Sequence, residues 1–161
     1  MKLSHLPLLL FLLICTSAHA QVSDSLWCDH LAEIIKCVST HTFTDRISKD
    51  LSDSTAIPAF IPELRLSKSK YELIKKEYNK VSYECYFYTQ EMNDQRLQKQ
   101  FVDWYKKIKS CLPQWEEARL PNANNVFFTF DDYFFTNSED ETAVRLDIIK
   151  DNGFQVRIRI F

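Results

Sequence analysis

The chain has 161 residues, about the size of one domain, and its 20 basic and 22 acidic residues leave a net charge of −2 at pH 7. This near balance argues against a dedicated nucleic-acid-binding protein, which usually carries a basic excess. The sequence has a single glycine, Gly153, which excludes P-loop enzymes, Rossmann dehydrogenases and typical α/β-hydrolases, because their motifs need several glycines.

The first twenty residues have the features of a signal peptide. Lys2 gives a positive start, residues 6–14 are mostly apolar, and Ala18-His19-Ala20 is a small-x-small cleavage motif. The apolar run is shorter than the roughly 20 residues that a membrane-spanning helix needs. We therefore expect cleavage near Ala20, a secreted or periplasmic location, no membrane span, and a mature chain of one disulfide-containing domain over residues 21–161. A membrane anchor and a lipoprotein are the alternatives.

Four cysteines follow this segment: Cys28, Cys37, Cys85 and Cys111. An even number in an exported chain indicates two disulfides. If Cys28 and Cys37 share the first helix, they lie about 13 Å apart, beyond the roughly 7 Å that a disulfide spans. A Cys28–Cys37 bond is therefore disfavoured, and with it a Cys85–Cys111 bond. Both remaining pairings tie the first helix to the second half of the chain.

Two segments have the apolar periodicity of amphipathic helices. The first should end near Thr40, and its apolar stripe is Trp27, Leu31, Ile34, Ile35 and Val38. The second runs from Asn93 to Leu112, before Pro113, and its stripe is Leu97, Phe101, Trp104, Ile108, Cys111 and Leu112. The two segments share three residues at the same spacing, namely Asp29 and Asp103, Ile34 and Ile108, and Cys37 and Cys111. This match indicates either two related halves or chance, and we favour chance.

Alternating apolar residues predict strands within residues 70–76, 81–88, 144–149 and 154–160, and Val126, Phe128 and Phe130 begin a further strand before the turn at residues 137–141. We interpret residues 39–55 as a loop and residues 114–120 as a polar connector. Two prolines in residues 57–62 argue against a central strand there and favour an extended segment along an edge or over the core. The predicted fold is α+β, with two amphipathic helices packed on an antiparallel sheet of about five strands. Its order is α-(irregular)-β-β-α-β-β-β.

The last two strands are predicted to form a hairpin closed by Asp151-Asn152-Gly153. A three-residue loop places all the apolar residues of both strands on one face. On the other face, this register pairs Asp147 with Arg157 and sets Arg145 opposite Arg159. Opposed like charges are unfavourable unless an anion or an acidic partner compensates them.

The candidate binding face is therefore formed by Arg145, Arg157 and Arg159, with an ordinary solvated sheet face as the alternative. Aromatic residues outside the core pattern, such as Tyr86, Phe127 and Phe134, raise a second question. Either helices and the proline-containing segment cover both faces of the sheet, which we favour, or an aromatic patch is exposed.

Other candidate chemistry is weaker. The spacing of Cys28, His30, Cys37 and His41 invites a zinc site, but Cys28 and His30 would point about 200° apart on a helix. We predict no metal site, no cofactor and no identifiable catalytic residue.

The function that we expect is that of an exported, non-catalytic binding or interaction domain for an unknown protein or anionic ligand. The alternative is a small exported hydrolase with a carboxylate or histidine site assembled by the fold. A concave pocket with convergent titratable groups would favour the hydrolase, and arginines or aromatic residues on a flat face would favour the binding domain.

Overall fold

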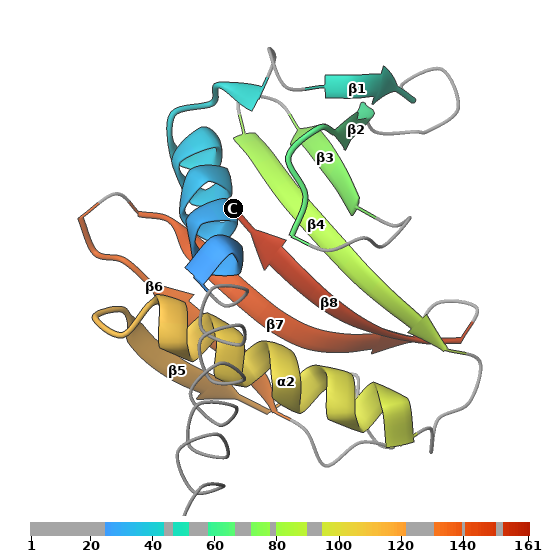
Figure 1. The fold of residues 1–161 in the computed structure, drawn as a ribbon, viewed down its shortest axis with the longest axis vertical. Coiled ribbons are helices and arrows are strands. Elements are labelled where there is room, and N and C mark those ends of the chain that lie inside the picture. Colours follow the sequence, from blue (N-terminus) through green and yellow to red (C-terminus); the bar gives the residue numbers. More distant parts are fainter. Residues whose placement is uncertain are drawn as a thin grey trace, which may run out of the picture.

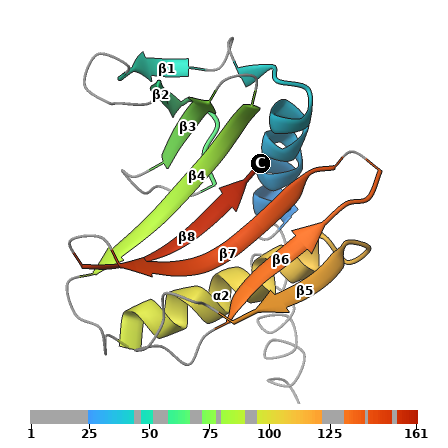
Figure 2. The same ribbon diagram turned by 180° about the vertical axis from the view of Figure 1, so that it is seen from behind.

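The computed structural model describes residues 25–43, 47–51, 58–66, 72–77, 80–89, 95–121, 131–139, 141–150 and 153–161. These residues form two helices and one eight-stranded antiparallel sheet (Figure 1). Both helices lie on the same face of the sheet, and the view from behind shows the other face in front of them (Figure 2). The predicted α+β class and antiparallel sheet are confirmed, but the sheet is larger than predicted and the order of the elements differs.

The first half consists of a helix over residues 25–39, β1 (Ile47–Asp50), β2 (Ala59–Pro62), β3 (Glu72–Glu77) and β4 (Lys80–Thr89). The second half consists of α2 (Gln95–Cys111), β5 (Glu116–Leu120), β6 (Asp132–Thr136), β7 (Ala143–Lys150) and β8 (Phe154–Ile160). The strands are ordered β1-β2-β3-β4-β8-β7-β6-β5 in the sheet. The two halves therefore meet at the pairing of β4 with β8, and β1 and β5 form the two edges.

The core lies between the helices and the sheet, and it contains the apolar stripes that the sequence predicts. The helices bury Leu31, Ile34, Ile35, Val38, Leu97, Phe101, Trp104 and Ile108. These residues pack in one cluster with strand residues that include Tyr83, Val144, Leu146, Val156, Ile158 and Ile160. Burial of these side chains is the main source of stability, at about 25 cal/mol per Å² of apolar surface removed from water.

One disulfide joins the two helices. Cys28 and Cys111 are bonded with their Cα atoms 5.1 Å apart, which is one of the pairings that helix geometry left open. Cys37 and Cys85 are buried and neither forms a disulfide. The structure therefore has one of the two predicted bridges among the described cysteines.

Three strands were not predicted, and all three are short. Most of β1 and β5 is exposed, so neither shows the apolar alternation that marks a half-buried strand. The segment with two prolines forms β2, which pairs with β1 on one side and β3 on the other. The prediction that this segment lies along an edge or over the core was therefore wrong.

Some predictions concern residues outside the described ranges. These are the signal peptide, the start of the second helix before residue 95, and the beginning of the strand that was predicted to start at Val126. The described strand of that region, β6, begins later, at Asp132.

The register of the last hairpin is as predicted. Val144 pairs with Ile160, Leu146 with Ile158, and Ile148 with Val156. On the opposite face, Asp147 pairs with Arg157 and Arg145 with Arg159. Gly153 has a φ of 140°, in a region that glycine enters at little cost and other residues avoid.

Candidate functional site

The sheet face opposite the two described helices brings together the three arginines that the sequence singled out. Arg145 lies on β7, and Arg157 and Arg159 lie on the neighbouring strand β8. We call this surface the arginine face. Its arginine side chains are 29%, 16% and 31% exposed, respectively, so each guanidinium is partly shielded from water.

A buried carboxylate lies at the centre of the arginine face. Asp147 has no exposed side-chain surface, and it accepts hydrogen bonds from Nε and Nη2 of Arg157 at 3.0 and 2.6 Å. Arg145 Nε lies 2.9 Å from the same carboxylate, and Arg145 Nη2 donates to Asp132 at 2.6 Å. Burial alone would lower the pKa of Arg157, but the hydrogen bonds and charge of Asp147 outweigh it and raise that pKa.

A second buried carboxylate on this face is Glu84 of β4, which contacts Lys75, Tyr86 and Arg159. Lys75 Nζ lies 2.6 Å from Glu84 Oε2, and the hydroxyl of Tyr86 donates to the same oxygen. Arg159 Nε lies 3.3 Å from Glu84 Oε1. Burial raises the pKa of the Glu84 carboxyl, but its hydrogen bonds with Lys75 and Tyr86 outweigh this and bring the pKa below its usual range.

Aromatic rings lie beneath three of these cations. Arg145 is 5.2 Å from the centroid of Phe134, Arg159 is 5.1 Å from that of Phe161, and Lys75 is 6.0 Å from that of Tyr86. Both described helices lie on the other face, and the proline-containing segment is strand β2 within the sheet. The favoured prediction that helices and this segment together cover both faces was therefore wrong. The aromatic residues of this face contact cations, whereas Phe135 is buried in the core. Phe127 lies outside the described residues.

Carboxylates of the protein itself therefore compensate the like charges of the opposed arginines. Register within the hairpin identified Asp147 as a partner of Arg157 from the sequence. Sequence reasoning missed Glu84 and Asp132, because their approach depends on the pairing of β4 with β8 and of β6 with β7. No local pattern in the sequence indicates which distant strands will pair.

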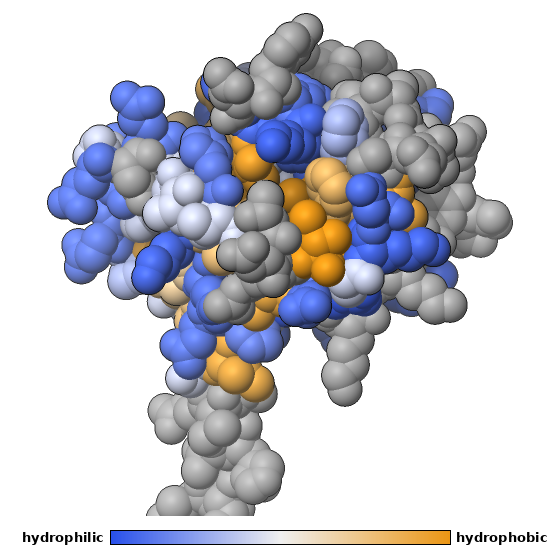
Figure 3. All heavy atoms as spheres, turned by 90° about the horizontal axis from the view of Figure 1, so that it is seen from above, coloured by the Kyte–Doolittle hydropathy of each residue, from blue (hydrophilic) through white to orange (hydrophobic). Residues whose placement is uncertain are grey.

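A pocket of about 650 Å³ lies where the first helix ends, next to the end of β8. We call it the helix-end pocket. Six of its polar lining residues are His41, Glu77, Lys80, Glu141, Thr142 and Arg159. Figure 3 looks onto this end of the molecule and shows hydrophobic residues at the centre with hydrophilic residues on both sides. The sequence did not predict this pocket, because its walls come from four separate segments.

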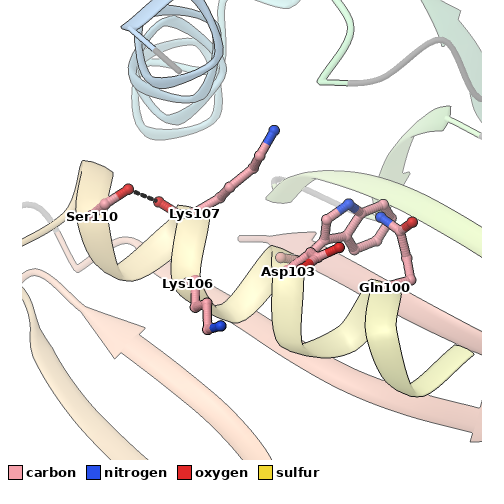
Figure 4. Close-up of a pocket in the computed structure, with 6 residues that line it drawn as sticks. Gln100, Asp103, Lys106, Lys107 and Ser110 are labelled. Atoms are coloured by element: carbon pink, nitrogen blue, oxygen red, sulfur yellow. Dashed lines mark hydrogen bonds between the residues drawn. The ribbon is translucent and has the colours of Figure 1, made fainter. Parts of the chain in front are cut away.

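A second pocket of about 540 Å³ lies along the exposed side of α2. Its described lining residues all come from that helix, and Figure 4 shows their side chains spread along it rather than converging. Lys107 extends toward the first helix, where its Nζ lies 5.7 Å from the ring centroid of Trp27. Ser110 donates a hydrogen bond to the Lys107 carbonyl at 2.8 Å.

The residues of the considered zinc motif are dispersed. Cys28 is bonded to Cys111, and Cys37 is buried in the core. His30 Nδ1 lies 3.1 Å from the Arg65 carbonyl oxygen, and His41 lines the helix-end pocket. Within the described ranges, no group of three or more His, Cys, Asp or Glu side chains could hold a metal ion.

Comparisons with known proteins provide no relative from which a function could be transferred. No protein-family model matches the chain, and no curated protein or solved structure is significantly similar to it. Neither described helix is long and apolar enough to cross a bilayer.

Proposed function

We propose that this protein is an exported, non-catalytic binding domain that contacts the acidic surface of a protein partner through the arginine face. The observation that carries the proposal is the arrangement of Arg145, Arg157 and Arg159 side by side on a sheet face that neither described helix covers. Arginine is well suited to such contacts, because its planar guanidinium binds carboxylates through two hydrogen bonds at once.

The buried acids prepare this surface for binding. They hold the guanidinium groups in fixed positions, so less side-chain entropy is lost when a partner docks. Four cations, Lys75, Arg145, Arg157 and Arg159, surround three carboxylates, Glu84, Asp132 and Asp147. The cluster therefore keeps an excess of one positive charge, which favours an anionic partner.

The hydrolase alternative has less support. A general acid at neutral pH needs a carboxyl whose pKa is raised toward 7, whereas the pKa of Glu84 is lowered. Asp147 is already engaged by two arginines. Arg145 and Arg157 lie 2.9 and 2.6 Å from Asp147, whereas the contact of Arg159 with Glu84 is longer, at 3.3 Å. Arg159 is therefore the best residue for a binding test.

The experiment uses a poly-glutamate peptide as a stand-in for an acidic protein surface. We expect it to bind the exported protein in low salt, to shift NMR signals of β7 and β8, and to bind more weakly as salt screens the charges. Arg159→Gln should weaken binding about tenfold, or about 1.4 kcal/mol.

The matched control is Arg119→Gln on the edge strand β5, whose side chain is 59% exposed. It should leave the affinity almost unchanged. Equal weakening by both variants would mean that the peptide senses only net charge, and the proposed face would be wrong.

A further inference from the structure

We infer that the helix-end pocket binds a small zwitterion, meaning an amino acid or short peptide that has both a free ammonium and a free carboxylate. This pocket is a different surface from the arginine face, because Arg159 is the one described residue that belongs to both. The inference starts from the charges that line the pocket.

Two cations, Lys80 and Arg159, and two carboxylates, Glu77 and Glu141, line the same cavity. In the part of the chain that the structure describes, Lys80, Glu77 and Glu141 form no ion pair with one another or with other residues. The carboxylates of the arginine face, in contrast, are all engaged by cations. The pocket therefore offers charges of both signs that a ligand can pair with.

A ligand with one charge fits this set poorly. An anion drawn to Lys80 and Arg159 would also face Glu77 and Glu141, and a cation would meet the opposite conflict. A zwitterion can satisfy both pairs, so the charge pattern selects against ligands that lack either group. Arg159 also lines the pocket, and its guanidinium has N–H donors other than Nε, which lies 3.3 Å from Glu84 Oε1.

The shape of the pocket follows from the strand register. Pairing of β4 with β8 begins at Tyr83 and Ile160. Lys80, which pairs with Glu77 of β3, therefore lies beyond the part of β4 that β8 covers, and it lines the pocket. Val38, Val81 and Phe161 add apolar lining for a hydrophobic side chain. The volume of about 650 Å³ lies in the range of small-molecule sites.

Backbone strain is concentrated at the same place. His41 and Glu141 have φ angles of 55° and 56°, and they are the two non-glycine residues with positive φ in the described segments. His41 takes the position after the first helix that glycine usually occupies, where Thr42 N donates to the Cys37 carbonyl at 3.0 Å. Such conformations cost on the order of 1 kcal/mol each, and they cluster at ligand sites.

Isothermal titration calorimetry with four probes tests the charge requirement. Leucine and leucylleucine are zwitterions, whereas N-acetylleucine lacks the ammonium and leucinamide lacks the carboxylate. We expect both zwitterions to bind at millimolar concentration or below, and each blocked compound to bind about tenfold more weakly, or about 1.4 kcal/mol. Tighter binding of leucylleucine would identify a peptide site, and tighter binding of leucine an amino-acid site.

Two variants locate the binding in this pocket. Lys80→Met should abolish the preference for leucine over leucinamide, and Glu141→Gln should abolish the preference for leucine over N-acetylleucine. The matched controls are Lys76→Met and Glu139→Gln, which alter exposed residues outside the pocket.

The inference would be wrong if neither zwitterion bound at millimolar concentration, if all four probes bound alike, or if the pocket variants behaved like their controls. A failure of the arginine-face experiment would leave these results unaffected, because Lys80 and Glu141 do not belong to that face.

Discussion

Individual residues of the arginine face are coupled through buried carboxylates, and Glu84 is the clearest case. Its side chain is 2% exposed, yet its pKa is lowered. Burial would raise that pKa, but hydrogen bonds with Lys75 and Tyr86 and the charge of Lys75 outweigh the effect. The folded state therefore binds fewer protons than the unfolded state near the pKa of Glu84.

The resulting prediction concerns stability at low pH. The carboxyl contributes stability above its unfolded pKa of about 4.3, and this contribution is lost as pH falls through the lower folded pKa. Glu84→Gln should cost about 3 kcal/mol near neutral pH, because it leaves the partly buried cations Lys75 and Arg159 without their carboxylate. It should also flatten the decline of stability below about pH 4. Urea unfolding at a series of pH values measures both effects.

Glu117→Gln is the control at a less buried site, where the carboxylate side chain is 20% exposed. Glu117 lies 2.8 Å from Lys109, whose side chain is 57% exposed, and solvent screens such pairs so that they contribute about 1 kcal/mol or less. If the two substitutions cost the same, burial would not be what gives Glu84 its importance.

At the residue scale, the sequence identified the arginines and only part of their surroundings. Asp147 could be placed beside Arg157, because a short loop fixes the register of one hairpin. Glu84 could not be placed beside Arg159, since β4 and β8 are far apart in the sequence. His41 and Glu141 gave no signal, because their positive φ angles occur at residues that do not usually adopt them.

At the scale of elements, strongly amphipathic segments were predictable and exposed edges were not. The buried stripe of α2 is the one that the periodicity indicated. By contrast, β1 and β5 are strands because their backbones pair with β2 and β6. Backbone hydrogen bonding does not require alternating apolar side chains, so the sequence pattern predicts loops where these strands form.

The disulfide between the two helices should be a major stabilising element. Cys28 and Cys111 are 83 residues apart, and closing a loop of that size in the unfolded chain contributes about 4 kcal/mol. The double variant Cys28→Ser, Cys111→Ser should lose that amount in urea unfolding. A reducing agent should lower the stability of the unmodified protein to the same level and leave the variant unchanged. If the reducing agent left the stability of the unmodified protein unchanged, the bond between Cys28 and Cys111 would be contradicted.

The described residues form two halves with the same order, a helix followed by four strands. The sheet order reads the same from either edge toward the central pair of β4 and β8. Ile34 and Ile108, one of the three residue matches between the helices, are both fully buried. This repeated topology favours two related halves over chance as the explanation of those matches. The three residue matches suggest two related halves, but it is the arrangement of the strands that supports this interpretation.

One mass measurement tests both the proposed export of the protein and the state of its cysteines. Protein recovered from an exporting host should have the mass of residues 21–161 less two hydrogens, because one disulfide forms and Cys37 and Cys85 remain thiols. After denaturation, a thiol reagent should modify Cys37 and Cys85, whereas in the folded protein their burial should slow the reaction greatly.

Two other masses would each overturn part of this account. A loss of four hydrogens would mean that Cys37 and Cys85 are also bonded, which would restore the second bridge expected from the even number of cysteines. A mass that includes residues 1–20 would show that the predicted signal peptide is retained, and the proposed secreted or periplasmic location would then lose its basis. Fast modification of Cys37 in the folded protein would instead show that the core opens readily around the first helix, since a buried thiol reacts only when the structure around it opens.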